Sequence, residues 1–112
     1  MVVDNALSGA EADGVFHALA DATRRDIVRT VLVREHSVSA LARRYPMSFA
    51  AVHKHVTVLE AAGLVTKQRS GRESLVRGDI DRVRDARSAL DALEQLWRDR
   101  VTQMDQILAE DH

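Results

Sequence analysis

SVSALARRYPMSFAAVHKHVTVLEAAGLV, residues 37–65, predicts two short helices joined by a tight break. We expect the first helix over roughly Ala40 to Tyr45, because Pro46 lacks a backbone N–H and disfavours the helical conformation of the residue before it. Ser48 is expected to cap the second helix, which runs to residue 61, because its hydroxyl can accept from backbone N–H groups of the first turn. Such a pair forms a helix-turn-helix.

The second helix has one apolar face. Phe49, Val52, Val56 and Leu59 recur at spacings that put them on one side of a helix, with Lys54 on the opposite side. The outward face is therefore narrow, and its only full charge is basic. A narrow face that begins at a helix N-terminus suits a recognition helix in the DNA major groove. The spacing alone also fits an ordinary helical hairpin.

A pair of strands follows the second helix. Gly63 is the residue type that ends a helix in the left-handed conformation without steric cost, and residues 64–69 then alternate as a strand. Residues 70–72 form a turn, and residues 73–77 return as a second strand. The sequence therefore predicts a mainly α (α+β) winged helix-turn-helix fold with a two-stranded β-wing and a long C-terminal helix.

The predicted wing, residues 66–73, is basic. Lys67, Arg69 and Arg72 lie around its flexible tip. Lys and Arg displace condensed counterions from phosphates, which gives affinity that does not depend on base sequence. We therefore expect the wing to lie along a DNA backbone.

Three stretches of the chain carry a family resemblance: LADATRRDIVRTVL at residues 19–32, the stretch 37–65, and the wing. They include Ala-Asp-x-Thr-Arg-Arg at the start of one helix, Val-x-x-His-x-x-x-Leu from Val52, and Ala-Gly-Leu-Val before the wing. Over roughly residues 15–77 the chain resembles the ArsR/SmtB-type bacterial winged-helix regulators, in a subgroup without recognisable metal ligands. The resemblance implies a homodimer that binds operator DNA, usually as a repressor, and that often responds to a metal or another signal.

Two sets of residues are candidate contacts to double-stranded DNA. The expected groove contacts are Ser48, Ala51, His53, Lys54 and Thr57. The expected phosphate contacts are Lys67, Arg69, Ser70 and Arg72, with Arg43 and Arg44 nearby.

Charge is segregated along the chain. Residues 1–22 carry a net charge of −4, residues 23–77 carry eleven basic and four acidic side chains for +7, and residues 78–112 carry five basic and nine acidic for −4. The overall charge of −1 is therefore the sum of two acidic ends and a basic central segment, residues 23–77, which we call the reading head. A solvated surface of mixed charge would explain each residue, but not this segregation.

The C-terminal region predicts a long helix with an apolar seam. Residues 79–110 contain no Gly or Pro, and apolar residues recur every seven positions in two rows, which Arg100 interrupts once. A single small domain cannot cover so much apolar surface, so a partner helix is implied, although part of the seam, such as Val83, is expected to be intramolecular core. Arg100 either pairs with an acidic residue across the interface or extends to solvent.

A first helix is expected from a capping box of Ser8 and Glu11 to about Ala20. In the resembling family, the first and last helices build the dimer. The expected interface residues are Val15, Phe16, Leu19, Leu90, Leu93, Trp97, Met104 and Ile107. A symmetric dimer would place two recognition helices roughly 34 Å apart and require an inverted-repeat operator.

The 112 residues fit one domain, with residues 1–22 as the N-terminal helix that contributes to the dimer, 23–77 as the DNA-binding core and 78–112 as the dimerisation helix. No run of about 18 apolar residues is present, and the N-terminal stretch lacks the basic start and apolar core of a signal peptide. We therefore expect a cytoplasmic protein that does not bind membranes.

The sequence does not predict a regulatory metal site. The chain has no Cys, and His53 and His55 lie about 200° apart around a helix, so they cannot bind one ion from a single face. His55 matches the family's common helix histidine and is expected to pack or to contact a phosphate. A site of His17 and His112 across a dimer is conceivable but lacks a ligand cluster. We expect no metal and no cofactor.

The sequence supports two other functions less well than DNA binding. No phosphate loop, nucleophile elbow or base-and-orienter spacing is present, so no enzyme is expected. A dimeric winged-helix module for protein interaction draws support from the apolar start of the recognition helix, Phe49 to Ala51, although apolar residues also read thymine methyl groups. The effector stays open: a small organic ligand near Trp97, a protein partner, a metal in a derepressor, or none.

Overall fold

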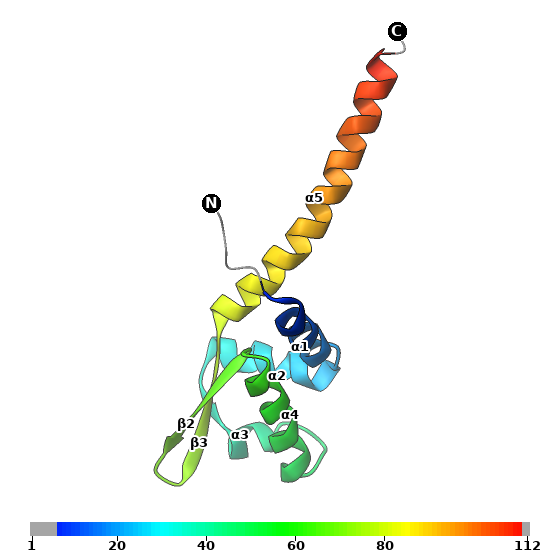
Figure 1. The fold of residues 1–112 in the computed structure, drawn as a ribbon. Coiled ribbons are helices and arrows are strands. Elements are labelled where there is room, and N and C mark those ends of the chain that lie inside the picture. Colours follow the sequence, from blue (N-terminus) through cyan, green and yellow to red (C-terminus); the bar gives the residue numbers. More distant parts are fainter. Residues whose placement is uncertain (1–6, 111–112) are drawn as a thin grey trace.

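The computed structural model describes residues 7–110. Along this part of the chain the elements are α1 (Gly9–Leu19), α2 (Ala22–Val33), β1 (His36–Ser37), α3 (Val38–Ala42), α4 (Phe49–Ala61), β2 (Val65–Ser70), β3 (Glu73–Gly78) and α5 (Ile80–Glu110). The wing tip and the start of α4 lie at one end of the molecule, and α5 projects from the other (Figure 1). The predicted winged helix-turn-helix with a long C-terminal helix is confirmed.

Helix ends follow the local signals in the sequence. Ser8 and Glu11 form the expected capping box at α1, with the Ser8 N–H donating to Glu11 Oε1 at 2.9 Å and the Glu11 N–H donating to Ser8 Oγ at 3.1 Å. Gly63 ends α4 with a φ of 79°, the left-handed conformation that glycine adopts without strain. The predicted extents of α1 and α4 therefore agree with the structure.

The first helix of the helix-turn-helix begins and ends earlier than predicted. Ser37 Oγ accepts from the Ala40 N–H at 3.0 Å, so α3 starts at residue 38 rather than at Ala40. α3 ends at Ala42, and Tyr45 lies outside it, as expected for the residue before a proline. The Tyr45 hydroxyl donates to Asp26 Oδ2 on α2 at 2.6 Å, which holds the turn between α3 and α4 against α2.

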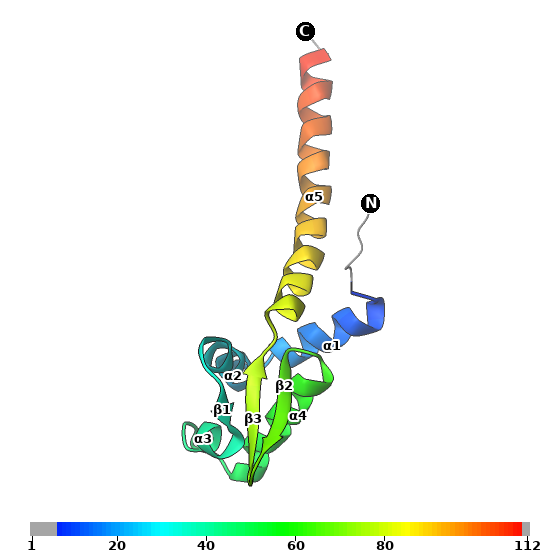
Figure 2. The ribbon, with the colours of Figure 1, turned by 90° about the vertical axis from the view of Figure 1, so that its left-hand side faces the viewer.

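The wing is part of a three-stranded sheet, whereas the sequence predicted two strands. The order is β1-β3-β2, all antiparallel, with His36 opposite Val76 and Lys67 opposite the same residue from the other side. Figure 2 shows β1 beside β3, where the short strand closes the edge near α2. Gly78 ends β3 close to α2, and a Cβ on this residue would lie 3.0 Å from the Leu32 Cα.

One core holds the helices α1 to α4 against the sheet and the start of α5. Its largest fully buried side chains come from α2, α3, α4, β2 and β3 and from the turn before β2: Ile27, Leu41, Leu59, Leu64, Val31, Val52, Val56, Val65 and Val76. Val15 on α1 is also fully buried in this core. The prediction that Val15 faces a partner chain is therefore corrected, because its side chain has no surface left to offer.

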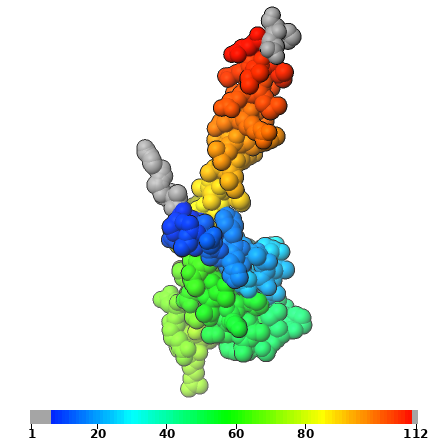
Figure 3. Space-filling model, turned by 45° about the vertical axis from the view of Figure 1, so that its right-hand side comes forward, coloured from blue at the N-terminus to red at the C-terminus, as the bar shows by residue number. Residues whose placement is uncertain are grey.

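α5 leaves the domain after two turns. Ala86 is buried and Val83 packs against the core, as expected for the inner end of the seam, and Arg82 forms an ion pair with Glu11 of α1 at 3.6 Å. From Leu90 outward the side chains are exposed or at most half-buried, and no other described segment covers them (Figure 3). The molecule measures 72 × 32 × 24 Å, mainly because of this helix. None of the described helices combines the length and apolarity needed to cross a membrane.

Candidate nucleic-acid interface

α4 presents one exposed face at the end of the molecule opposite α5 (Figure 1). Ser48 caps the helix, and its Oγ accepts from the Ala51 N–H at 3.1 Å. The exposed residues of its first three turns recur with helical spacing and are Phe49, Ala50, His53, Lys54 and Thr57, whereas Ala51 is half-buried. We call these five exposed residues the reading face. Its slim outline and its position at a helix N-terminus suit insertion into a DNA groove.

Phe49 belongs to the reading face and not to the buried stripe, so that prediction was wrong. Its side chain is 53% exposed, whereas Val52 is fully buried. As the first residue of α4, Phe49 lies beyond the core that covers the later turns. Its ring instead stacks on His53, with ring centroids 6.2 Å apart and an angle of 23° between the rings.

The buried side of α4 is held by Arg24 from the first turn of α2. The Arg24 guanidinium donates to the Ala18 and His17 carbonyl oxygens at the end of α1, at 2.7 and 3.2 Å. Its third nitrogen lies 3.2 Å from His55 Nδ1, which accepts because a guanidinium only donates. Only 13% of the Arg24 side chain is exposed. His55 is thus a packing residue of α4, and Arg24 ties three helices together.

The wing tip is formed around Gly71, whose φ of 61° is the left-handed conformation that favours glycine. Arg69 Nε donates to the Gly71 carbonyl oxygen at 3.1 Å, and Ser70 and Arg72 are exposed beside it. The structure therefore gathers these three predicted phosphate contacts at one place. Both arginines carry their charge at the outermost part of the sheet.

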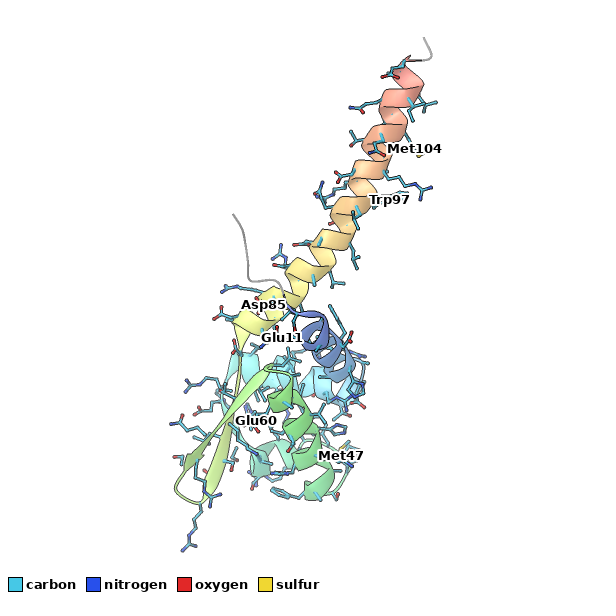
Figure 4. All side chains as sticks on the ribbon, in the orientation of Figure 1. Glu11, Met47, Glu60, Asp85, Trp97 and Met104 are labelled. Carbon is cyan, nitrogen blue, oxygen red and sulfur yellow. The ribbon has the colours of Figure 1, made fainter. Side chains whose placement is uncertain are left out.

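Lys67 was predicted to lie at the wing tip, but the structure places it away from the tip. Its Nζ is 3.7 Å from Glu60 Oε1, and the side chain is 24% exposed. Figure 4 shows Glu60 between α4 and the wing. The ion pair forms because β2 runs back along α4, so Lys67 joins the wing to the helix. Arg43 and Arg44 are exposed in the turn after α3, at the edge of the helix-turn-helix.

Comparison with known proteins identifies this architecture. A family described as a helix-turn-helix domain matches residues 19–68. The HTH-type transcriptional regulator Rv2034 of Mycobacterium tuberculosis is 33% identical over 96 residues, which are 86% of this chain and 87% of that protein. An ArsR-like transcriptional regulator from Rhodococcus sp. RHA1 superposes with a TM-score of 0.78 at 35% identity, covering 88% of this chain and 92% of that one. The chain belongs to the ArsR family of helix-turn-helix transcriptional regulators.

A further solved relative of this ArsR-family regulator is Mb0332 from Mycobacterium bovis, described as a homodimeric winged helix-turn-helix DNA-binding domain. It superposes with a TM-score of 0.62 at 27% identity, over 85% of this chain and 84% of that fragment. The resemblance inferred from the sequence motifs is therefore confirmed, and the chain is a DNA-binding transcriptional regulator rather than an enzyme.

Sequence reasoning missed two features of this ArsR-family site. The first is the exposure of Phe49, which helical periodicity assigned to the core. The second is the contact between Arg24 and His55, which lie 31 residues apart in the chain. The Ala-Asp-x-Thr-Arg-Arg motif marked Arg24 as part of the family pattern, but only the packing of α1, α2 and α4 shows what its side chain does.

The histidines of the regulator do not converge on a metal site in the described residues. His53 faces outward and His55 faces Arg24, which separates them as the helical spacing predicted. No group of three or more His, Cys, Asp or Glu side chains suited to a metal lies within residues 7–110. The conceivable pair of His17 and His112 involves a residue outside this range.

Asp21, the N-cap of α2, makes the stability of this regulator depend on pH. Its side chain accepts from the Arg24 N–H at 3.0 Å, and this hydrogen bond is the main reason that the pKa of Asp21 lies below its ordinary value. Because the folded pKa is lowered, the stabilisation is complete above the ordinary carboxyl pKa of about 3.9 and is lost as the pH falls through the folded value. We expect Asp21→Asn, which keeps a capping group, to lose less stability on acidification than wild type. Thermal unfolding between pH 7 and 3 measures this, and parallel loss in both proteins would contradict it.

Proposed function

We propose that this ArsR-family regulator is a homodimer that represses transcription by occupying an inverted-repeat operator. Helix 48–61 would enter the major groove and wing 66–73 would follow the phosphates. One observation carries the proposal: a single chain has an exposed reading face at one end and an uncovered apolar seam at the other (Figure 1). Pairing through the seam would present two reading faces, as an inverted repeat with half-sites roughly 34 Å apart requires.

The apolar surface of α5 supports the homodimer. We define the α5 seam as the five large residues Leu90, Leu93, Trp97, Met104 and Ile107, which are 54–64% exposed. Figure 4 shows Trp97 and Met104 on the outer half of the helix, beyond every other element. An exposed apolar strip of this kind marks an interaction surface, because leaving it in water is unfavourable. The homodimeric relative from M. bovis favours a second copy of the same chain as the partner.

The proposal assigns dimerisation and DNA binding to different segments of the chain. Residues 1–22 and 78–112 would form the dimer, with Phe16 and Leu19 of α1 beside the α5 seam, and residues 23–77 would bind DNA. Phe16 is 37% exposed and Leu19 is half-buried, so both retain surface for a partner. We place the protein in the cytoplasm, where the bacterial chromosome lies.

The proposed DNA contacts fall into two classes. Groove contacts are Ser48, Ala51, His53, Lys54 and Thr57. Phosphate contacts are Arg69, Ser70, Arg72, Arg43 and Arg44. Lys67 would reach a phosphate only by leaving Glu60.

Electrophoretic mobility shift on the DNA upstream of the regulator's own gene tests the proposal. The measurement is made at near-physiological salt, with scrambled competitor, and with and without chelator. A specific shift that chelator does not change would support a metal-independent operator-binding regulator. If no shift occurs there, selection of bound genomic fragments follows, and a failure to enrich any sequence would overturn the proposal.

Replacing both wing arginines, Arg69→Ala and Arg72→Ala, is expected to weaken binding to all DNA sequences alike. The plot of log affinity against log salt has a negative slope. Each lost phosphate contact should make this slope less steep by about 0.9, because fewer counterions are released. The measurement is affinity at several salt concentrations for a specific and a scrambled duplex. Arg84→Ala with Arg87→Ala is the matched control, because these exposed arginines lie on α5. An unchanged slope would show that the wing does not follow the phosphates.

A protein-interaction module is the second candidate function. The observation that favours it is the apolar start of the reading face, where Phe49 is half-exposed and two alanines follow. If genomic selection fails while the α5 seam still forms a dimer, this function moves to first place.

A further inference from the structure

We propose that Phe49 helps to determine operator specificity by packing its ring against the 5-methyl group of thymine in the major groove. The inference rests on the proposed DNA-binding function and names the chemical group that the reading face recognises. Phe49 would be a specificity-determining residue in addition to the groove contacts predicted from the sequence.

The position of Phe49 is the first reason. It is the first residue of α4, directly after the capping Ser48, and the N-terminal residues of a recognition helix are those that meet base edges. Its 53% exposure shows that the core does not need the ring. The two residues that follow are alanines, so the Phe49 ring is the largest side chain in the first turn of the reading face.

The stacking of Phe49 on His53 is the second reason. The two rings lie 6.2 Å apart at an angle of 23°, one helical turn from each other. A side chain already held in one arrangement loses little conformational freedom when it makes a contact. The pair therefore forms a preorganised apolar edge on the face that would enter the groove.

The chemistry of the major groove selects the ligand group. Thymine presents a methyl group there, and apolar side chains recognise it by direct contact. Phe49 has no hydrogen-bond donor or acceptor, so its ring cannot read the polar edges of guanine, cytosine or adenine. Lys54 and the wing arginines supply charge around it but cannot distinguish a methyl group. The Phe49 ring is therefore suited to contact the thymine 5-methyl group.

The test removes the methyl group without changing base pairing. The probe is the duplex that the full chain enriches from a random library, with each thymine of the half-sites replaced singly by deoxyuridine. Wild type should lose about fourfold in affinity at one or two positions per half-site, the effect of losing one buried methyl contact. Phe49→Ala should bind the thymine probe more weakly and show no further loss with deoxyuridine at those positions. Phe49→Leu, which keeps an apolar side chain, should retain part of the discrimination.

Val33→Ala is the matched control, because Val33 is 85% exposed at the end of α2 and lies outside the reading face. It should discriminate as wild type does. The proposal is overturned if every deoxyuridine is neutral for wild type, or if the same positions remain sensitive in Phe49→Ala. Unchanged affinity of Phe49→Ala for the thymine probe would also overturn the proposal. A wild-type chain that enriches no sequence would overturn the proposed operator binding together with this inference, whereas enrichment with uniform tolerance of deoxyuridine would overturn only the role of Phe49.

Discussion

Replacing Leu93 and Trp97 by aspartate is expected to lower operator affinity by roughly 10²–10⁴-fold, the usual gain from binding through two linked sites. Both residues belong to the α5 seam and are more than 60% exposed in the single chain, so a charge there does not disturb the core. In a dimer the same charges would be buried without partners, which strongly disfavours association. The double variant should be a folded monomer that binds one half-site weakly.

The control places the same charges on the opposite side of α5. Ala92→Asp with Gln95→Asp changes two exposed residues that lie away from the seam in the heptad pattern, and its cost in helix propensity is at least as large, because Ala and Gln together are better helix formers than Leu and Trp. Sedimentation velocity gives the association state, and mobility shift gives operator affinity. We expect the control to stay dimeric and to bind as wild type does. A seam variant that remained dimeric with full affinity would show that the chains associate elsewhere.

Replacing Arg24 by methionine is expected to lower the free energy of unfolding by about 2–4 kcal/mol, because several hydrogen bonds from a charged donor are lost together. The acceptors left behind are the His17 and Ala18 carbonyl oxygens and the His55 ring nitrogen. Methionine fills similar space but donates to none of them. Operator affinity should fall as well, since Arg24 connects α4 to the end of α1.

Arg25→Met is the comparison that isolates this effect. Arg25 is an exposed neighbour that donates only to the Leu19 carbonyl oxygen, at 2.8 Å, among the described side-chain contacts. It should cost much less stability and leave operator affinity unchanged. Urea unfolding must compare all proteins at one protomer concentration, because association contributes to the apparent stability of a dimer. Equal losses for the two substitutions would contradict the role given to Arg24.

Features of the fold that depend on a few neighbouring residues were predictable from the sequence. The Ser8 cap, the Ser48 cap and the glycine at position 63 each act within about four residues of the chain, and the structure places all three as expected. The apolar periodicity of α5 is equally local. Its inner turns proved to be core and its outer turns exposed, because one short domain covers only the first part of a 31-residue helix.

Features that depend on distant residues were not predictable. Strand β1 is two residues long and exists because His36 and Ser37 pair with Val76 and Leu75, about forty residues later. Periodicity also put Phe49 with the buried residues of its helix, since spacing alone does not reveal where the core ends. Lys67 was assigned to the wing tip from its place in the sequence. In the structure β2 runs back along α4, and this brings Lys67 next to Glu60.

The projection of α5 beyond the domain separates two kinds of sequence constraint. Substitutions in the core change whether the reading head folds, while those in the outer turns of α5 are expected to change which chain becomes its partner. A gene duplication could therefore give two regulators that no longer exchange subunits through a few changes in the seam, with the reading faces untouched. The outer turns of α5 would then determine which of these related chains pair with each other.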